Sequence, residues 1–564
     1  MLRFSDDPLV AEKQMHAVIF YLTTFGYIDG DFDRKEKDFI RDYIGRLVSQ
    51  RVESGAAHLP RDARQSLRET YTARFLAVFD ATDKQIEEMY TQAVAHQEEI
   101  TQVVQTQLKV RCFEIFQDFD RDNQEQLMDT IDELVMADGE AHPAEIKFRG
   151  ELAQLLEAEL SVELIEEGPP DRPAMETTTA VPSHAEVHPF FEQFEHDYAT
   201  DPETMQRQIA ADRAAIARTL VVLDEWRRKG QGRLAGKHSA NQLAGQAAFL
   251  DGHIWVCPPQ PDRRYDLTVL GDLHGCYSCL KGAVMQARFF DKVRRFREDP
   301  QGQPEPKLVL LGDYIDRGIF SLNGVLRTAL LLFCTVPEHV VILRGNHEYF
   351  IEFEGDIYGG VKPSEAIDSL KQRVSTEVFR DYMRLFDALP AALIFDRTFF
   401  VHGGIPRDLT FKTHYTDLAS LNHPDLRFEM MWSDPSSADI VPVSLQAESA
   451  RFCFGRLQAQ HFLRRIGCHA LIRGHEKINE GVRRTYDDKD MLLLTVFSAG
   501  GAENHDLPPR SNYRLVTPMA LTMRYENGHS RITPWPIDWA PYNDPQRNAF
   551  FRETPSWVSA PGST

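Results

Sequence analysis

The sequence predicts an α/β fold for the second half of the chain, preceded by an all-α N-terminal region. Two patterns carry this prediction. Between residue 9 and about residue 165, apolar residues recur at helical spacing, as in residues 15–22 and 39–44, and strand signals are scarce. From about residue 265, short β-rich apolar runs alternate with helical stretches, which is typical of strands followed by helices.

Changes in composition divide the 564 residues into five parts. The stretch 166–190 is rich in proline, threonine and acidic residues and is therefore predicted to be a linker. A helical pattern follows it, and the last twenty residues look like a polar tail. The expected parts are an all-helical domain 1–165, the linker 166–190, a helical connector 191–260, a catalytic domain 261–545 and a C-terminal tail 546–564.

Composition argues against several classes of partner. The net charge of −22 disfavours nucleic acid and an anionic membrane surface as the main partner. No apolar run reaches the length of about 18 residues that a membrane span needs, and the first residues lack the apolar core of a signal peptide. Seven scattered cysteines fit a reducing compartment, so we expect a cytoplasmic protein.

Five predicted strands lead directly into polar segments that contain glycine. These segments are Gly271–Gly275, Gly312–Gly318, Gly345–Glu348, His402–Gly404 and Arg473–Glu476. In an open α/β sheet, ligands bind beyond the carboxyl ends of the strands, so the polar side chains are expected to gather at one rim. Imidazole and carboxylate together suit manganese, iron or zinc, and a carboxylate can bridge two such ions. The pattern predicts a phosphate-ester hydrolase with two metal ions.

Together with residues 431–435 and 497–499, these segments resemble the PPP family of serine/threonine phosphatases, within the calcineurin-like metallophosphoesterases. The resemblance covers about residues 265–530. It implies a β-sandwich flanked by helices (αββα). It also implies a protein phosphatase that hydrolyses phosphorylated proteins by direct attack of a hydroxide bound to two divalent metal ions. We expect manganese, with iron or zinc as alternatives.

The resemblance also implies a role for each matching residue. His347 is expected to protonate the leaving alkoxide while Asp316 orients it, and Arg317 is expected to hold phosphate oxygens. Asp313 is expected to bridge the two ions. The full set of expected metal ligands is Asp272, His274, Asp313, Asn346, His402 and His475.

Two segments depart from the family pattern. Arg451 lies directly before residues 452–455, closer than the family's second phosphate-binding arginine, so it either takes that role or is an ordinary surface residue. The loop 498–502 lacks the aromatic residue that overhangs the metals in the family. A small-molecule phosphoesterase, such as a dinucleoside tetraphosphate hydrolase, is therefore the alternative function. A scaffold with an inert catalytic half is a third.

The helical region contains two similar acidic turns. Asp29-Gly30-Asp31 precedes Glu36, and Asp138-Gly139-Glu140 precedes Glu145, with the same spacing. The turns resemble those of the TerB-like helical domain of tellurite resistance, which implies a regulatory domain for a metal or a partner. The alternative is that they are well-capped helix turns. Residues 118–129 alternate acidic side chains as a calcium loop does but depart from it at the eighth position.

Overall fold

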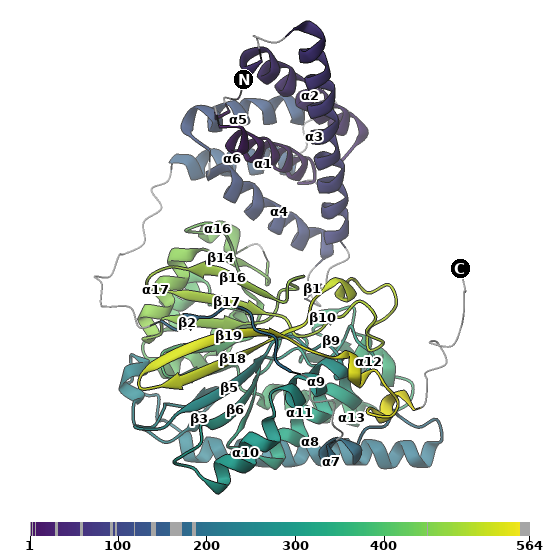
Figure 1. Ribbon diagram of the computed structural model, residues 1–564, viewed down its shortest axis with the longest axis vertical. Helices are drawn as coiled ribbons and strands as arrows, with labels where there is room; N and C mark the ends of the chain where they lie inside the picture. The colour runs from purple at the N-terminus through teal and green to yellow at the C-terminus, as the bar shows by residue number, and fades with distance from the viewer. Residues whose placement is uncertain are drawn as a thin grey trace. The chain divides into compact units, whose positions relative to one another are not determined.

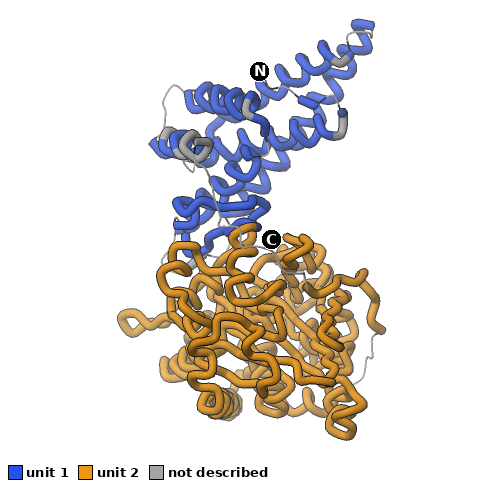
Figure 2. Tube along the Cα trace, turned by 90° about the vertical axis from the view of Figure 1, so that its left-hand side faces the viewer, with its two compact units in different colours: residues 1–162, 436–456 blue, residues 163–435, 457–564 orange. Residues whose placement is uncertain are grey.

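The computed structural model describes residues 2–552, apart from residues 3, 6, 29–31, 57–59, 91–93, 96–98, 118, 137–142, 158–171, 183–187 and 448. The chain forms two compact units (Figure 2). Unit 1 consists of residues 1–162 and 436–456, and unit 2 consists of residues 163–435 and 457–564. Each unit therefore combines two segments that are distant in the sequence.

Unit 1 is built mainly from helices, as the sequence predicts (Figure 1). Their apolar faces form one core that includes Leu22, Phe25, Ile44 and Phe79. The helices are α1 (Pro8–Gly26), α2 (Arg34–Gly55), α3 (Arg61–Met89), α4 (Ile100–Gln117), α5 (Arg121–Val135) and α6 (Pro143–Glu157), with a two-residue strand β1 (Val94–Ala95). The 436–456 segment adds helix α16 (Val443–Gln446) and strand β14 (Cys453–Phe454).

Helix capping accounts for acidic residues at or next to two of the predicted acidic turns. Asp33 Oδ1 accepts a hydrogen bond from Glu36 N at 2.8 Å, and Glu36 Oε2 accepts one from Asp33 N at 3.0 Å, so the pair caps α2. Asp120 caps α5 by accepting from Asn123 N at 2.9 Å. The turns at 29–31 and 138–140 lie outside the described residues, so the TerB-like metal site stays a prediction.

Unit 2 contains two large β-sheets whose buried residues form one hydrophobic core. The strand order is β16-β17-β15-β12-β11-β4-β3 in one sheet and β2-β19-β18-β5-β6-β7 in the other. Helices cover the outer faces: α10 packs on β6, α11 packs on β7, and Phe462 of α17 contacts Phe399 of β12. This αββα arrangement confirms the predicted fold class (Figure 1).

The strands of the two sheets are short, and most are fully buried. Strands of the seven-stranded sheet are β3 (Phe249–Asp251), β4 (Ile254–Val256), β11 (Ala392–Phe395), β12 (Thr398–Val401), β15 (Ala470–Arg473), β16 (Val482–Asp487) and β17 (Leu492–Val496). Strands of the six-stranded sheet are β2 (Ala174–Met175), β5 (Tyr265–Leu270), β6 (Glu305–Leu310), β7 (Val340–Ile342), β18 (Met519–Glu526) and β19 (His529–Pro536).

Helices and hairpins connect these strands. The longer helices of unit 2 are α8 (Pro202–Gly230), α9 (Tyr277–Gln286), α10 (Phe289–Glu298), α11 (Arg327–Thr335), α13 (Thr376–Ala388), α15 (Pro424–Trp432) and α17 (Arg456–Ile466). Shorter elements are α7 (Pro189–Glu192), β8 (Phe350–Phe353), β9 (Asp356–Gly359), β10 (Val361–Lys362), α12 (Glu365–Leu370), β13 (Asp434–Pro435), α14 (Asp408–His414) and the 3₁₀ turn η4 (Asn512–Leu515). Among the described residues, none of the helices has the length and apolarity needed to span a membrane.

The stretches predicted as a linker and a helical connector contribute strands. Ala174 and Met175 of β2 pair in parallel with Arg531 and Ile532 of β19. Beyond α8, strands β3 and β4 pair with each other, and β4 pairs with β11. Strands of two or three residues are too short to show a period of two, which is why composition suggested a linker and a connector there.

The site is built where the two sheets meet. Strands β5, β6 and β7 run parallel in one sheet, and β12, β15 and β17 run parallel in the other. Asp272, two residues beyond the end of β5, forms a parallel bridge with Phe497, the first residue after β17. Ser498 N also donates to Asp272 O at 3.1 Å. The expectation that all five strands end at one rim of a single sheet is therefore wrong. The strands belong to two sheets, which this bridge joins.

Candidate active site

Each predicted metal ligand lies just beyond the strand that the sequence placed before it. Asp272 and His274 follow β5, Asp313 follows β6, Asn346 follows β7, His402 follows β12 and His475 follows β15. All six side chains are buried, with 0–6% of their surface exposed. A polar set buried this deeply must be satisfied by partners within the site.

The backbone at the site is strained. Ten non-glycine residues in the described part of the chain have positive φ, and five of them are candidate site residues: His274, Asp313, Asp316, Arg317 and His475, with φ between 43° and 70°. Such residues cost about 1–3 kcal/mol each and persist only where the surrounding structure fixes them. This concentration of strain supports a functional role for these loops.

Asp313 lies between two groups of potential metal ligands. Its Oδ2 is 3.5 Å from His274 Nε2 and 3.9 Å from His347 Nε2. Its Oδ1 is 3.3 Å from His402 Nε2. The two groups, His274 with His347 and His402 with His475, each lie close enough to Asp313 to hold a cation with it. One carboxylate facing two groups is the arrangement that a bridging ligand requires.

The proton positions of two histidines direct lone pairs into the site. His274 Nδ1 is 2.9 Å from Ile315 O, and His402 Nδ1 is 3.1 Å from Leu311 O. Because a backbone carbonyl only accepts, each Nδ1 carries the proton and each Nε2 presents a lone pair. His274 Nε2 then faces Asp272 Oδ2 at 3.7 Å. Lone pairs facing carboxylates without a proton between them fit a bound cation.

The contacts of Asn346 with His402 and His475 also call for a proton donor or a cation. Its Oδ1 lies 3.0 Å from His402 Nε2 and 3.1 Å from His475 Nδ1. Turned the other way, the amide nitrogen would donate to these atoms and to Asp313. Either a proton donor or a cation is therefore required where the three side chains meet, and a divalent ion would satisfy all of them.

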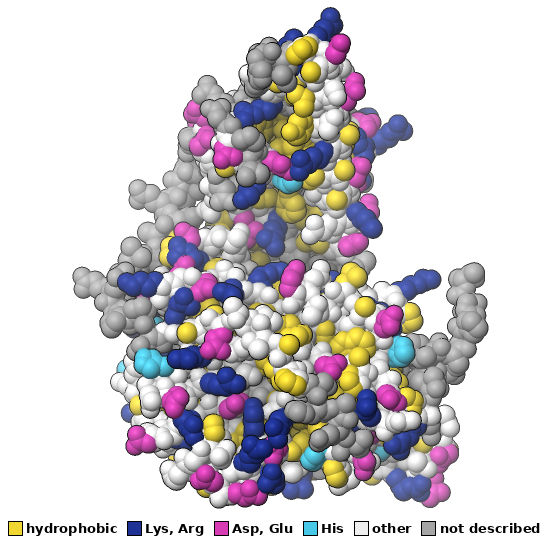
Figure 3. Space-filling view, in the orientation of Figure 1, with side chains coloured by type: hydrophobic (Ala, Val, Ile, Leu, Met, Phe, Trp, Pro, Cys, Tyr) yellow, Lys and Arg dark blue, Asp and Glu magenta, His cyan; other side chains and the backbone are white. Residues whose placement is uncertain are grey.

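Electrostatics support the same conclusion. Burial, and secondly the charge of Asp313, raises the pKa of Asp272 to about 7. Burial lowers the pKa of both His274 and His402, which keeps the imidazoles neutral as metal ligands must be. On the face that Figure 3 shows, basic and acidic side chains are interspersed. Borderline divalent ions suit this donor set and would supply the positive charge that a phosphate ester needs.

His347 and Asp316 form a second functional pair. His347 Nδ1 is 2.7 Å from Asp316 Oδ2, and Asp316 Oδ1 accepts from Ala366 N at 2.8 Å. Burial raises the pKa of Asp316 to about 6. The pair fixes the imidazole so that its Nε2 points toward the Asp313 carboxylate, where a reacting group would lie.

Arg317 is held by one side of its guanidinium. Nη1 pairs with Glu365 Oε1 at 3.1 Å and donates to Pro363 O at 3.3 Å. Nη2 is buried and has no hydrogen-bond partner within the described part of the chain. A buried, unsatisfied guanidinium nitrogen beside this site is a donor for an anion such as phosphate.

Arg451 belongs to unit 1, whereas the other nine candidate residues belong to unit 2. It lies in the 436–456 segment, just before β14, and its backbone N–H donates to Ser449 Oγ at 3.1 Å. Its side chain is half-buried. The phosphate-binding role of Arg451 therefore stays a prediction.

Several supporting residues were not assigned by the sequence. Glu348 lies inside the Asn-His-Glu segment and accepts from Asp313 N, Tyr314 N and Gly345 N at 2.8–2.9 Å. Arg473 is fully buried, and its Nη2 pairs with Asp434 Oδ1 at 2.6 Å. Glycine and motif spacing flagged these segments, but the partners are backbone groups and residues distant in sequence, which spacing does not reveal.

Tyr513 supplies an aromatic ring that the 498–502 loop lacks. It comes from η4 and packs on His274, with ring centroids 5.4 Å apart, and on Phe497 at 5.3 Å. An isolated tyrosine in a polar loop carried no sequence signal for this position.

Replacing Glu348 tests the structural support of the ligand loops. Burial, and then the charge of Asp313, raises the pKa of Glu348 to about 8, and three backbone donors depend on its carboxyl group. We expect Glu348→Ala to lower the free energy of unfolding by about 3 kcal/mol or more, because each buried unsatisfied donor costs about 1–3 kcal/mol. Urea unfolding measures this, with the exposed Glu338→Ala as control. Equal midpoints for both variants would contradict it.

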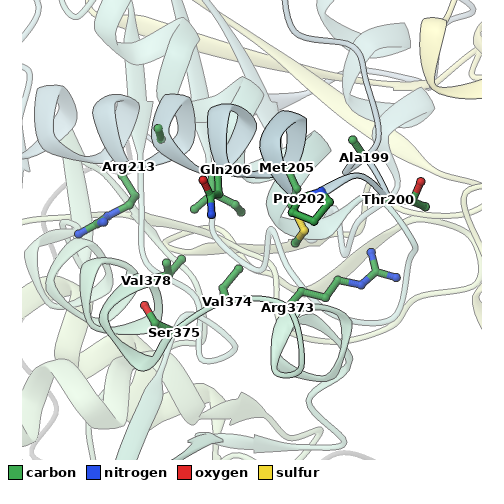
Figure 4. Close-up of a pocket in the computed structure, with 12 residues that line it drawn as sticks. Ala199, Thr200, Pro202, Met205, Gln206, Arg213, Arg373, Val374, Ser375 and Val378 are labelled. Atoms are coloured by element: carbon green, nitrogen blue, oxygen red, sulfur yellow. The ribbon is translucent and has the colours of Figure 1, made fainter.

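Two further features of unit 2 contain none of the candidate residues. His414, His423 and Asp425 lie together, but His423 Nδ1 accepts from Asp425 N at 3.3 Å and caps α15, which explains the cluster. A cavity of about 630 Å³ lies between α8 and the start of α13. Met205 and Val374 face each other across it, with Arg373 beside them (Figure 4).

Comparison with known protein families shows which class of enzyme has this site. Residues 265–478 match the family of calcineurin-like phosphoesterases. This stretch contains all six candidate ligands and the His347–Asp316 pair. The catalytic region is therefore a calcineurin-like phosphoesterase domain.

Individual relatives narrow the class of enzyme that the catalytic region resembles. The serine/threonine-protein phosphatase 4 catalytic subunit of Saccharomyces cerevisiae is 28% identical over 240 residues, covering 41% of this chain and 68% of that protein. The phosphatase 6 catalytic subunit of Caenorhabditis elegans is 30% identical over 241 residues, covering 41% and 64%. The catalytic domain of this chain is therefore similar to the catalytic subunits of serine/threonine-protein phosphatases.

Solved structures show a more distant likeness. A protein serine/threonine phosphatase of Saccharomyces cerevisiae, similar to human phosphatase PP5, covers 58% of this chain and 89% of that one. The identity is 18% and the TM-score is 0.36. A cold-active protein-tyrosine phosphatase of Shewanella covers 50% of this chain and 82% of that one, with 13% identity and a TM-score of 0.28.

Proposed function

We propose that this chain is a metal-dependent serine/threonine protein phosphatase. The observation that carries the proposal is Asp313, a buried carboxylate that faces one group of ligands with each oxygen. The relatives named as serine/threonine-protein phosphatases support the substrate class. We further propose manganese as the resident metal, with iron and zinc as alternatives, because neutral imidazole and carboxylate ligands suit all three.

The residues of this chain divide the work of hydrolysis. Two divalent ions, when bound, would neutralise charge on the phosphate and lower the pKa of the attacking water. Arg317 Nη2 would hold a phosphate oxygen, since it has no other partner among the described residues. His347, fixed by Asp316, would give its proton to the leaving alkoxide of serine or threonine. Asp272, His274, Asn346, His402 and His475 would hold the metals with Asp313.

Phosphate release from phosphoserine and phosphothreonine peptides tests the proposal. With manganese, the full chain is expected to release phosphate at an ordinary enzyme rate of about 1–10³ per second, and EDTA should abolish release. Absence of release from every peptide by metal-loaded protein would contradict a protein phosphatase. That result would leave two functions, a phosphoesterase that acts on nucleotides or a scaffold with an inert catalytic half.

A small-molecule phosphoesterase is the second candidate, and the altered 498–502 loop favours it. Gly500 and Gly501 have φ of 157° and 110°, so at least Gly501 adopts a conformation that side chains avoid, and the loop carries no aromatic ring. Comparing kcat/KM on phosphopeptides with kcat/KM on diadenosine tetraphosphate separates the two. A higher value on the dinucleotide would replace the proposal with the alternative.

We also propose a cytoplasmic location. None of the seven cysteines forms a disulfide bond, including Cys276 and Cys279, whose sulfur atoms lie 3.1 Å apart. Two adjacent thiols of this kind are compatible with a reducing compartment.

A further inference from the structure

The start of α12 and the residues just before it contact two neighbouring site residues. Ala366 N donates to Asp316 Oδ1 at 2.8 Å. Arg317 Nη1 donates to Pro363 O at 3.3 Å and pairs with both carboxylate oxygens of Glu365 at 3.1 and 3.2 Å. One short stretch therefore contacts both a member of the acid pair and the candidate phosphate-binding arginine.

The backbone of these two site residues is strained and needs such support. Asp316 and Arg317 have φ of 66° and 65°. A non-glycine residue keeps this conformation only where the surrounding structure fixes it. Helix α12 provides a fixed support because Ala366, Ile367 and Leu370 are buried in the core of unit 2.

The contacts of Arg317 leave one of its nitrogen atoms available. The guanidinium is a rigid planar fork, so holding Nη1 also sets the direction of Nη2. Nη2 is buried and has no hydrogen-bond partner among the described residues. The side chain of Arg317 is 14% exposed and that of Glu365 is 46% exposed. A pair exposed to this extent adds little to folding stability, so its main effect is on the direction of the guanidinium.

We propose that Glu365 is a positioning residue that directs Arg317 toward the phosphate group of the substrate. This proposal rests on the proposed function. Glu365 holds Nη1, and Nη2 is then oriented before the phosphate arrives. An arginine ordered in advance loses less conformational entropy on binding an anion, which raises the affinity. Because the Glu365 carboxylate is half-exposed, water and salt screen its repulsion of the phosphate, and the orienting effect dominates.

The test measures the affinity of the manganese-loaded full chain for inorganic phosphate by calorimetry. Arg317→Ala is expected to weaken phosphate binding about tenfold, the effect of losing one charge-assisted contact. Glu365→Ala should weaken it about three- to tenfold, the effect of ordering one long side chain only on binding. Glu365→Gln should bind nearly as the wild type does, because its amide oxygen still accepts from Nη1. In the Arg317→Ala background, Glu365→Ala should cause no further loss.

Steady-state kinetics on a phosphoserine peptide separate positioning from a general structural role. Glu365→Ala should raise KM by the same factor and leave kcat nearly unchanged, because its side chain does not contact the His347–Asp316 pair. Damage to the start of α12 would instead loosen Asp316 and lower kcat as well. Asp368→Ala, which removes another exposed carboxylate from α12, is the matched control and should change neither KM nor phosphate affinity.

Each result decides between distinct conclusions. Wild-type or tighter phosphate binding by Glu365→Ala would overturn the proposal, as would an equal loss in Glu365→Gln or a further loss in the Arg317→Ala background. A parallel fall in kcat would assign Glu365 a structural role and overturn it too. If the wild-type chain bound no phosphate, the proposed function would fail and this proposal with it. Binding and hydrolysis by the wild type, with Glu365→Ala unaffected, would overturn this proposal alone.

Discussion

Asp313→Asn is expected to abolish phosphate-ester hydrolysis, with kcat reduced by about 10³-fold or more. The physical reason is the position of the carboxylate, whose two oxygens face His274 and His402 at 3.5 and 3.3 Å. The amide keeps the size of the side chain but loses its charge and one lone-pair oxygen. We expect the metal content to fall from two ions per chain to one or fewer, measured by elemental analysis after gel filtration.

A matched buried aspartate provides the control. Asp251 is also buried and accepts from Gly232 N at 3.1 Å and Leu234 N at 2.8 Å, but it contacts none of the candidate ligands. Asp251→Asn should therefore change stability without changing the metal content. If Asp313→Asn retained two ions and near wild-type kcat, Asp313 would not bridge, and the assignment of the site would fail.

The sequence predicts the ends of the site's strands well because the local signal is strong. A short β-rich run leads into a polar residue with a glycine beside it at Asp272, Asp313 and His402, and each residue lies where that pattern puts it. Burial on both faces makes such strands apolar throughout, so they stand out from the surrounding helices. What periodicity cannot show is which strands share a sheet.

Long-range partners explain the parts that the sequence does not predict. The bridge between Asp272 and Phe497 joins strands of different sheets across more than two hundred residues. Tyr513 reaches His274 from a polar loop, and Glu348 binds backbone groups that any sequence would offer. The 436–456 segment joins unit 1 through α4, a pairing that no local pattern in either stretch encodes.

His347→Asn is expected to reduce kcat on a phosphoserine peptide by about 10²–10⁴-fold, the contribution of a positioned general acid. The serine alkoxide is a poor leaving group and needs the proton that His347 would donate. Loss on p-nitrophenyl phosphate should be much smaller, because nitrophenolate leaves without protonation. Metal content should stay at the wild-type value. Equal losses on both substrates would mean that His347 serves binding or structure and not proton transfer.

A second buried histidine and the pH profile complete this test. His339 is buried with Nδ1 2.9 Å from Pro306 O, so His339→Asn is a matched change outside the site and should leave kcat unaltered.

Because burial raises the pKa of Asp316 to about 6, its carboxylate is ionised above that pH and protonated below it. The ionised form is the one that accepts from His347 Nδ1–H. Wild-type kcat should therefore fall as the pH drops through about 6, whereas the residual activity of His347→Asn should lack that fall, since the residue that Asp316 orients is gone.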